Sequence, residues 1–482
     1  MVPEQFSLRP EIACHKEEPS MADHLSAVLD HIDADLDKSL ERLFEFIRIP
    51  SISTDPAYKE DCRRAAEWLT VQLRELGFVA ATRATPGHPM VVGHQTQAAK
   101  GPHVLFYGHY DVQPVDPVEL WNTPPFEPTL VAAPNGDTWI VARGASDDKG
   151  ALMTFLEACR AWKTVSGELP IRVSILFEGE EESGSPSLKP FLEANSDELS
   201  ADVALVCDTD MWDDETPAIT TMLRGLVGEE VEITCADRDL HSGMFGAAAR
   251  NPIHLLTEIL ATLRDADGRI TLQGFYDDVS ELPKAVKEQW ARLPFDEASF
   301  LNQVGLSIPA GEKGRGVLEQ IWARPTCEIN GIVGGYIGEG FKTVIPSKAS
   351  AKVSFRLVSG QNPTKIREAF RDHVRSYMPA DCTVTFRDHG ASPALSLPLD
   401  GPWLRPALDA LTAEWGREAT LAGTGGSIPI VGDFKRLLGM DALMVGFARF
   451  DNRVHSPNEK YDLSSFHHGI RSWARILAAF AR

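Results

Sequence analysis

The chain is 482 residues long, with 43% hydrophobic and 24% charged residues and a formal net charge of −22. This length exceeds one ordinary hydrophobic core and predicts about two to three globular domains. The acidic charge argues against nucleic acid or an anionic membrane surface as a partner, because both require a basic face. The sequence has no apolar run of about eighteen residues, so we expect no membrane span.

Residues 1–20 are polar and lack the apolar segment of a secretory signal, so we interpret them as a disordered leader. Met21 begins a helical pattern and is an alternative start of the protein. The seven cysteines are scattered and form no CxxC pair. Such a set favours a reducing compartment, and we expect a cytoplasmic protein.

Helices and strands alternate through the first part of the chain. The spacing of apolar residues predicts helices over 36–49, 59–76 and 150–162. Short β-type runs lie at 90–92, 104–107, 139–141, 171–177 and 203–206. We therefore predict an α/β fold in which helices flank a sheet.

The pattern changes after about residue 222. Strands are predicted at 226–235, 327–333, 351–357 and 383–387, and two helices at 252–263 and 363–378. We interpret 223–391 as an α+β domain inserted into a discontinuous catalytic domain made of 21–222 and 392–482.

Five potential metal ligands follow apolar runs of the predicted catalytic domain: His109, Asp147, Glu182, Asp208 and His455. Segments at the carboxyl ends of strands in an α/β sheet converge on one crevice. Two imidazoles and three carboxylates suit two divalent ions that share one carboxylate. Each acid alone is better explained as a solvated loop residue or a helix cap, but the combined pattern favours a metal site.

Two further acids stand beside these ligands. Asp111 lies two residues after His109, where a carboxylate can hold the second ring nitrogen of a metal-binding imidazole. Glu181 and Glu182 belong to three adjacent glutamates after an apolar strand. Such acids repel one another unless water or cations surround them. One glutamate could therefore bind metal while its neighbour acts on water.

Seven segments in this order resemble the M20 family of metallopeptidases, and most resemble its cytosolic nonspecific and carnosine dipeptidase branch. They are Gly108-His109-Tyr110-Asp111-Val112-Gln113-Pro114, Arg143-Gly144-Ala145-Ser146-Asp147-Asp148-Lys149-Gly150, Glu181-Glu182-Ser183-Gly184-Ser185, Asp237-Arg238-Asp239-Leu240-His241-Ser242-Gly243, Thr343-Val344-Ile345-Pro346, Gly425-Gly426-Ser427-Ile428-Pro429 and His455-Ser456-Pro457-Asn458-Glu459-Lys460. Each segment alone is a weak signal, but the ordered set is specific.

The resemblance implies a division of labour among these residues. His109 and Asp208 would hold one ion, Glu182 and His455 the other, and Asp147 would bridge them. Zinc is the first choice, and manganese or cobalt also suits this ligand set. Glu181 would be the general base and acid, and Asp111 would orient His109. The peptide bond between Asp147 and Asp148 is expected to be cis.

The resemblance also implies that the inserted domain is a lid and dimerisation domain. His241 would reach the active site of the other subunit in a homodimer and polarise the scissile carbonyl. Asn330, Thr343 and Arg356 resemble the positions that bind the C-terminal carboxylate of the substrate. Gly426 and Ser427 would line the pocket beside the metals.

We therefore predict a metal-dependent exopeptidase for dipeptides or short peptides. Asp208, where the deacylases would have glutamate, favours a substrate with a free amine. Thr424, Asp210 and Arg453 depart from the dipeptidase pattern, so an N-acyl amino acid amidohydrolase of the acetylornithine or succinyl-diaminopimelate type is the alternative. A non-catalytic binding protein on the same fold would have an incomplete ligand set, whereas this sequence has all five ligands and Glu181.

Overall fold

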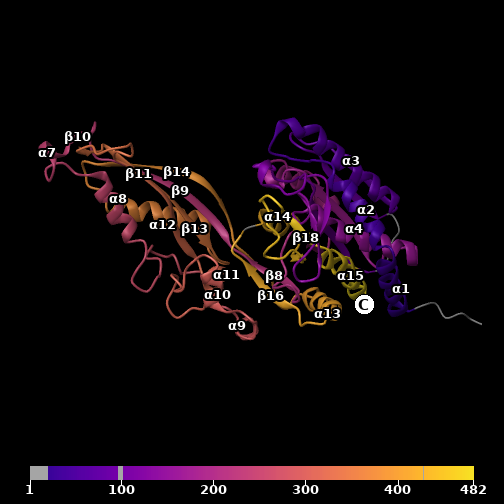
Figure 1. The fold of residues 1–482 in the computed structure, drawn as a ribbon. Coiled ribbons are helices and arrows are strands. Elements are labelled where there is room, and N and C mark those ends of the chain that lie inside the picture. The colour runs from indigo at the N-terminus through magenta and orange to yellow at the C-terminus, as the bar shows by residue number, and fades with distance from the viewer. Residues whose placement is uncertain (1–19, 96–100, 427, 482) are drawn as a thin grey trace, which may run out of the picture.

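The computed structural model describes residues 20–95, 101–426 and 428–481. Figure 1 shows two bodies, one built on a nine-stranded sheet and the other on a four-stranded sheet that extends away from it. The predicted leader, apart from Ser20, lies outside the described residues. Ser20 caps the first helix, α1 (Met21–Ala34), in a capping box with Asp23.

The large sheet has a parallel centre, as an α/β fold requires. Its central order is β6-β3-β7-β17, and each neighbouring pair there is parallel. The parallel order brings the carboxyl ends of these strands to the same edge. The strands, in sheet order, are β1 (Phe78–Arg83), β2 (Met90–Gln95), β6 (Arg172–Glu178), β3 (His103–His109), β7 (Val203–Val206), β17 (Ala442–Met444), β8 (Ala218–Leu223) and β15 (Leu395–Ser396), with β16 (Thr420–Thr424) beside β8.

Helices cover both faces of this sheet. On β3, Phe106 stacks on Phe155 of α4 (Lys149–Ser166) and meets the edge of Trp473 of α15 (Leu463–Phe480). The next residue, Tyr107, meets Phe434 of α14 (Pro429–Leu438). Because successive side chains of a strand point to opposite faces, α14 lies on the face opposite α4 and α15. The predicted α/β fold with helices around the sheet is confirmed.

The remaining helices of this body are α2 (Leu36–Ile47), α3 (Lys59–Glu75), α5 (Leu188–Ala194), α6 (Ser196–Leu199) and α13 (Leu404–Trp415), with the short 3-10 helices η1 (Pro56–Tyr58), η2 (Val118–Leu120) and η3 (Glu181–Ser183). A three-stranded sheet of β18 (Lys460–Asp462), β5 (Thr138–Val141) and β4 (Thr129–Ala132) lies beside them. Within the described residues, no helix has the length and apolar character that crossing a bilayer requires.

The second body is an antiparallel sheet with two helices on one face. Its order is β11 (Thr326–Gly334), β13 (Lys348–Leu357), β9 (Gly225–Thr234) and β14 (Thr383–Ser392). The helices α8 (Pro252–Ala261) and α12 (Pro363–Ser376) pack on it over a separate apolar core. A single residue, Arg224, separates the end of β8 in the large sheet from the start of β9. We propose that the inserted domain spans 223–391, with Leu223 still part of β8 and β14 continuing to Ser392.

The inserted segment contains more helices than the two that the sequence predicted. The helices α9 (Lys284–Trp290) and α11 (Val317–Trp322) contact β16 of the large sheet, and α10 (Glu297–Asn302) lies between them in the chain. At the far end of the second body, β10 (Leu240–His241) pairs with β12 (Val344–Ile345) beside α7 (Ser242–Phe245). The prediction of two helices was therefore incomplete, because these helices are too short to show a clear apolar period.

Glu414 fastens α13 to α15. Its carboxylate, 1% exposed, accepts hydrogen bonds from Arg471 Nε at 2.6 Å and Arg475 Nε at 2.7 Å, and contacts His468 Nδ1 at 2.8 Å. Burial alone would raise the pKa of Glu414, but these contacts lower it from 4.5 to about 2. Since this pKa is lower in the folded state, the carboxylate stabilises the fold above about pH 4.5 and loses that effect as the pH falls towards 2.

We expect Glu414→Gln to lower the free energy of unfolding at pH 7 by about 3 kcal/mol. Urea unfolding at pH 7 and at pH 4 measures this effect, and the gap to the wild type should be smaller at pH 4. Glu418→Gln, at an exposed position near the end of the same helix, is the control. A gap that does not change with pH would contradict the assigned cause.

Candidate metal centre

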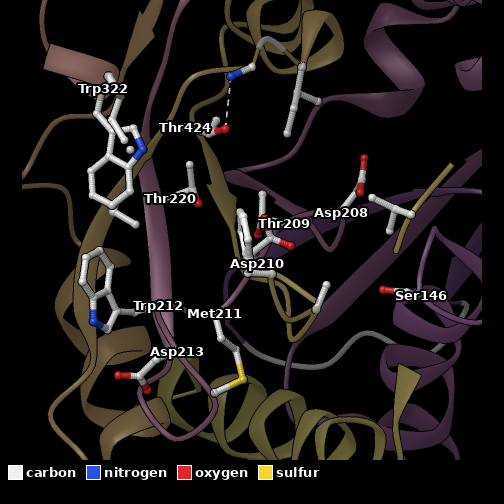
Figure 2. Close-up of a pocket in the computed structure, with 18 of the residues that line it drawn as sticks. Ser146, Asp208, Thr209, Asp210, Met211, Trp212, Asp213, Thr220, Trp322 and Thr424 are labelled. Carbon is white, nitrogen blue, oxygen red and sulfur yellow. Dashed lines mark hydrogen bonds between the residues drawn. The ribbon is translucent and has the colours of Figure 1, made fainter. Parts of the chain in front are cut away.

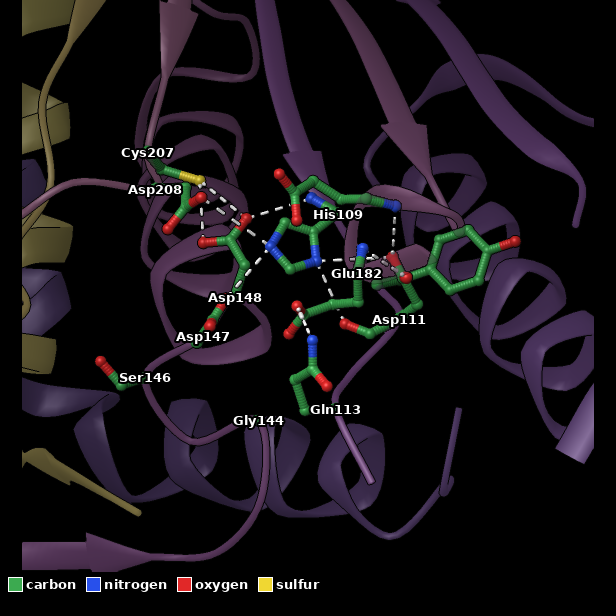
Figure 3. Close-up of polar contacts among 12 residues, drawn as sticks. His109, Asp111, Gln113, Gly144, Ser146, Asp147, Asp148, Glu182, Cys207 and Asp208 are labelled. Carbon is green, nitrogen blue, oxygen red and sulfur yellow. Dashed lines mark hydrogen bonds and ion pairs between the residues drawn. The ribbon is translucent and has the colours of Figure 1, made fainter. Parts of the chain in front are cut away.

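The five predicted ligands meet at the carboxyl edge of the large sheet. His109 is the last residue of β3, Glu182 follows β6 within η3, and Asp208 follows β7 by two residues. Asp147 comes from the turn before α4, and His455 from the loop between β17 and β18. Figure 3 shows His109, Asp147, Asp208 and Glu182 drawn together at this edge.

The ligand atoms form two groups that share Asp147. His109, Asp147 and Asp208 make one group, and Asp147, Glu182 and His455 the other, each with its atoms within 4.8 Å of one another. Asp147 Oδ1 lies 3.1 Å from His109 Nε2, and Asp147 Oδ2 lies 2.9 Å from His455 Nε2. One carboxylate therefore offers a separate oxygen to each group.

The outer carboxylates complete the two groups. Asp208 Oδ2 lies 4.0 Å from His109 Nε2, and Glu182 Oε2 lies 3.3 Å from His455 Nε2. His109 Nε2 is buried, and although Asp147 Oδ1 lies 3.1 Å away, this nitrogen makes no well-directed hydrogen bond among the described residues. A buried polar atom without a partner is costly, and a cation would satisfy it. Mixed imidazole and carboxylate donors fit divalent metal ions.

Negative charge accumulates in this small volume. Burial, followed by the charges of Asp147 and Asp148, raises the pKa of Asp208 well above its usual value. Hydrogen bonds to Asp147 and Glu182 raise the pKa of His455 to about 10. Burial would raise the pKa of Asp147, but contacts with His109 and His455 hold it well below its usual range. The negative charge of the cluster therefore favours the binding of positive charge, as a cation site requires.

Asp111 connects the first imidazole to the glutamate turn. Its backbone oxygen lies 3.1 Å and its Oδ1 3.4 Å from His109 Nδ1. Its carboxylate also accepts hydrogen bonds from the backbone N–H of Glu181 at 3.3 Å and of Glu182 at 3.0 Å. Asp111 is fully buried, so it can fix the His109 ring and the start of η3 at once.

The carboxylate of Glu181 stands apart from this network. It makes no hydrogen bond to any residue that the structure describes, and only its backbone N–H is bound by Asp111. Burial raises its pKa; the charge of His109 opposes the rise, and the nearby Glu182 adds to it. A carboxylate with a raised pKa and unengaged oxygens is suited to accept a proton and return it.

Sequence reasoning missed the role of Glu459. This buried carboxylate accepts hydrogen bonds from Arg143 Nη1 at 2.7 Å and from the backbone N–H of Gly144, Ser146 and Asp147 at 3.0, 2.9 and 3.1 Å. It thereby holds the turn that carries Asp147. Glu459 stood in the quoted segment after His455, but contacts across more than 300 residues leave no local signal.

Asp148 supports the same turn from the other side. Its Oδ2 accepts a hydrogen bond from the backbone N–H of His109 at 3.0 Å, and burial raises its pKa to about 7. The peptide bond between Asp147 and Asp148 is cis, as expected. The two adjacent acids therefore have different partners, one among the ligand side chains and one on the β3 backbone.

Two predicted residues lie far from these groups within the same chain. His241 and Thr343 are exposed and adjacent at the distal end of the second body, where Ser242 N donates to Thr343 O at 3.1 Å. The Nδ1 atom of His241 accepts a hydrogen bond from Gly243 N at 3.0 Å. Figure 1 shows β10 and α7 at the opposite end of the molecule from β18 and α15. The chain does not bring His241 to its own metal ligands.

The other predicted substrate residues belong to the second sheet and to the loop after β16. Asn330 is exposed in β11 at a register shift, and Arg356 of β13 pairs with Leu226 of β9. Gly426 is exposed, and its carbonyl oxygen accepts a hydrogen bond from Arg224 N at 3.2 Å. Ser427 lies outside the described residues.

Arg224, in the connection between β8 and β9, is a second residue that sequence reasoning missed. Its Nε and Nη1 atoms are buried and have no partner in the described part of the chain. Burial and the charge of Arg356 lower its pKa to about 10. The guanidinium groups of Arg224 and Arg356 repel each other, and neither has an ion pair within the described ranges. Together they form a site that favours binding of an anion. The sequence signal that could have revealed Arg224 is its position as a charged residue between two apolar strand patterns.

Comparison with known proteins assigns the chain to a protein family. Residues 105–479 match Peptidase family M20/M25/M40, and the chain belongs to this family. It is 30% identical over 477 residues to the Cys-Gly metallodipeptidase DUG1 of Candida albicans, covering 95% of this chain and 98% of that one. It is 27% identical over 482 residues to the Beta-Ala-His dipeptidase of Homo sapiens, covering 95% of this chain and 93% of that one.

A solved structure agrees with this assignment. The M20 family metallo-carboxypeptidase Sso-CP2 from Sulfolobus solfataricus has a TM-score of 0.77 and 31% identity, covering 92% of this chain and 99% of that one. The predicted resemblance to M20 metallopeptidases and their dipeptidase branch is confirmed. The chain is a metal-dependent hydrolase of peptide bonds.

Proposed function

We propose that the protein hydrolyses dipeptides, with a free amine at one end and a free carboxylate at the other. The observation that carries this proposal is the pair of ligand groups that share Asp147, beside the unengaged carboxylate of Glu181. The names of two relatives, a Cys-Gly metallodipeptidase and a Beta-Ala-His dipeptidase, support a dipeptide substrate. They do not favour the N-acyl amino acid amidohydrolase.

His109 and Asp208 would hold one divalent ion, Glu182 and His455 a second, and Asp147 both. Zinc is our first choice, with manganese and cobalt as alternatives. Such ions lower the pKa of water and polarise carbonyl groups when they are bound. Gln113 Nε2 donates a hydrogen bond to Glu182 Oε2 at 2.7 Å, which would keep that ligand in position.

Glu181 would move the proton. Its raised pKa and unengaged carboxylate suit a group that takes a proton from the attacking water and returns it to the leaving nitrogen. Asp111 would act as a positioning residue, because it binds the backbone of Glu181 and contacts the ring of His109. The same carboxylate would thus orient a metal ligand and the proton carrier.

The carboxylate of the substrate would bind to Arg356, with Asn330 nearby in the same sheet and Arg224 as a second cation. Arg356 makes no ion pair with the residues that the structure describes, so its charge is available to a ligand. A planar guanidinium matches the two oxygens of a carboxylate. Gly426 and Ser427 would line the path between this site and the metals.

A homodimer would bring the two distal residues, His241 and Thr343, to an active site. His241 and Thr343, exposed at the distal end, would reach the active site of a second subunit. Ile329, Ile332 and Val333 are exposed on the edge strand β11 of the second sheet, at 45%, 50% and 62%. An exposed apolar edge strand is a natural pairing surface. We further propose a cytoplasmic location, consistent with free cysteines at Cys62, Cys159, Cys207, Cys235, Cys327 and Cys382.

We expect Arg356→Met to lower kcat/KM for Ala-Gly by about 10- to 100-fold, because charge-assisted hydrogen bonds to the substrate carboxylate would be lost. The comparison substrate is the C-terminal amide of Ala-Gly, which lacks that charge and should be cleaved with similar efficiency by wild type and variant. Arg387→Met, at an exposed position on β14 of the same sheet, is the control. An unchanged preference for the free acid would contradict the role of Arg356.

The substrate class itself is tested by a panel on the metal-loaded enzyme. We expect cleavage of a free dipeptide and little or no cleavage of its N-acetylated form. Analysis of products by mass spectrometry identifies the bond that breaks. Hydrolysis of the blocked compounds alone would favour the amidohydrolase and overturn the dipeptidase assignment.

A further inference from the structure

A pocket of about 630 Å³ opens beside the ligand groups. Asp147 and Asp208 both line it, and Figure 2 shows Asp208 on one side with Trp212 and Trp322 on the other. Figure 2 shows Asp210 between these two sides. The volume is within the range of small-molecule sites and far exceeds what a glycine or alanine side chain needs.

The aromatic side of the pocket is held in place by its own packing. The rings of Trp212 and Trp322 meet edge to face at 5.7 Å between centroids, and Trp322 meets Trp290 at 5.1 Å. Trp290 Nε1 donates a hydrogen bond to Leu421 O at 2.7 Å, which ties α9 to the large sheet. This wall comes largely from the helices α9 to α11, which the sequence analysis left unassigned. It is formed before a substrate arrives.

The wall continues towards solvent with further aromatic side chains. Phe295 packs against Trp212 at 6.0 Å and against Phe300 at 5.5 Å. Phe450, which is 85% exposed, and Val454 also line the pocket. Apolar side chains exposed around a concave site mark a surface that an apolar group can cover.

The position of the pocket identifies which part of a dipeptide would enter it. Its lining includes Asp147 and Asp208 from the metal groups and Thr424 from β16, but not Arg356. If the carboxylate binds Arg356 and the scissile carbonyl lies at the metals, the pocket faces the other side of the scissile bond. The side chain and amine of the first residue therefore belong here.

Two acids of the pocket lining lie outside the metal groups, Asp210 and Asp213, and Asp213 is engaged by the backbone N–H groups of Glu215 and Thr216. The side chain of Asp210 lines the open pocket and makes no hydrogen bond or ion pair with any described residue. Thr424 Oγ1, across the pocket, accepts a hydrogen bond from Gly426 N at 3.2 Å and carries no charge. An unpaired carboxylate beside an apolar wall suits an ammonium group next to a large side chain.

We infer that this pocket selects dipeptides whose first residue has a large aromatic or apolar side chain, and that Asp210 pairs with the free α-amine of that residue. The inference rests on the proposed dipeptidase function and adds the substrate class. Burying a side chain of the size of phenylalanine, instead of alanine, should raise kcat/KM by about 10- to 100-fold.

Three substrates of the metal-loaded enzyme test the selectivity for a large side chain and the pairing of Asp210 with the amine. They are Phe-Gly, Ala-Gly and 3-phenylpropanoyl-glycine, which is Phe-Gly without its amine. We expect kcat/KM for Phe-Gly to exceed each of the other two by about 10- to 100-fold. Phe300→Ala and Phe450→Ala should lower the ratio of Phe-Gly to Ala-Gly, while Asp210→Asn should lower the ratio of Phe-Gly to 3-phenylpropanoyl-glycine. Phe450 is exposed, so its removal does not endanger the fold.

The matched controls are Val71→Ala on α3 and Asp214→Asn, an exposed acid near Asp210 in the chain, and both should leave the ratios unchanged. Equal cleavage of Phe-Gly and Ala-Gly would overturn the aromatic selectivity and leave the dipeptidase function standing. Equal cleavage of Phe-Gly and its des-amino analogue would overturn the role of Asp210. If neither dipeptide were cleaved, the proposed function itself would fail.

Discussion

Replacing Glu181 by glutamine is expected to lower kcat for dipeptide hydrolysis by about 10²- to 10⁴-fold while leaving bound metal unchanged. The amide keeps the size of the side chain but cannot accept the proton of the attacking water. Metal should stay because Glu181 belongs to neither ligand group. Steady-state kinetics together with elemental analysis of the purified protein measures both quantities.

The matched control for this variant is Glu193→Gln, an exposed glutamate on α5. It should have wild-type kcat and metal content. Near-normal turnover by the Glu181 variant would remove Glu181 from the proposed mechanism. Loss of metal together with activity would instead show that Glu181 is a ligand.

Replacing Asp147 by alanine is expected to have the largest effect on metal content. Its two oxygens face different groups, so both would lose a ligand. Because bound ions contribute several kcal/mol to catalysis, we expect activity to fall by on the order of 10³-fold or more. Isothermal titration of the metal-free variant with zinc measures the number of sites and their affinity.

His455→Ala is the matched comparison, because His455 belongs to only one of the groups. We expect it to weaken one binding site and leave the other close to wild type. If Asp147→Ala still bound two ions as tightly as the wild type, Asp147 would not be shared. If both variants lost a single site, the division of ligands would be wrong.

The sequence predicted what local patterns encode. His109, Glu182 and Asp208 stand at or within a few residues of the ends of strong apolar strands, so their position at one edge follows from the parallel order of β6, β3 and β7. Strands such as β8 and β16 were missed because they are rich in small or polar residues, for example Thr220 and Thr424. Their apolar alternation is weak.

Contacts between distant parts of the chain could not be predicted. Glu459 binds the turn of Asp147 from the other end of the sequence, and Trp212 meets Trp322 across the junction of the two bodies. Neither pairing has a periodic signal. His241 is a different case, because the residue was recognisable by its motif, but its proposed partner site belongs to another subunit.

We propose that two ions per chain support hydrolysis of a dipeptide. Adding zinc, manganese or cobalt stepwise to the metal-free protein, while measuring both bound metal and the rate of dipeptide cleavage, tests it most directly. We predict that full activity is reached only when about two ions are bound to each chain. Full activity of the metal-free protein, or of a protein that binds a single ion, would contradict the account.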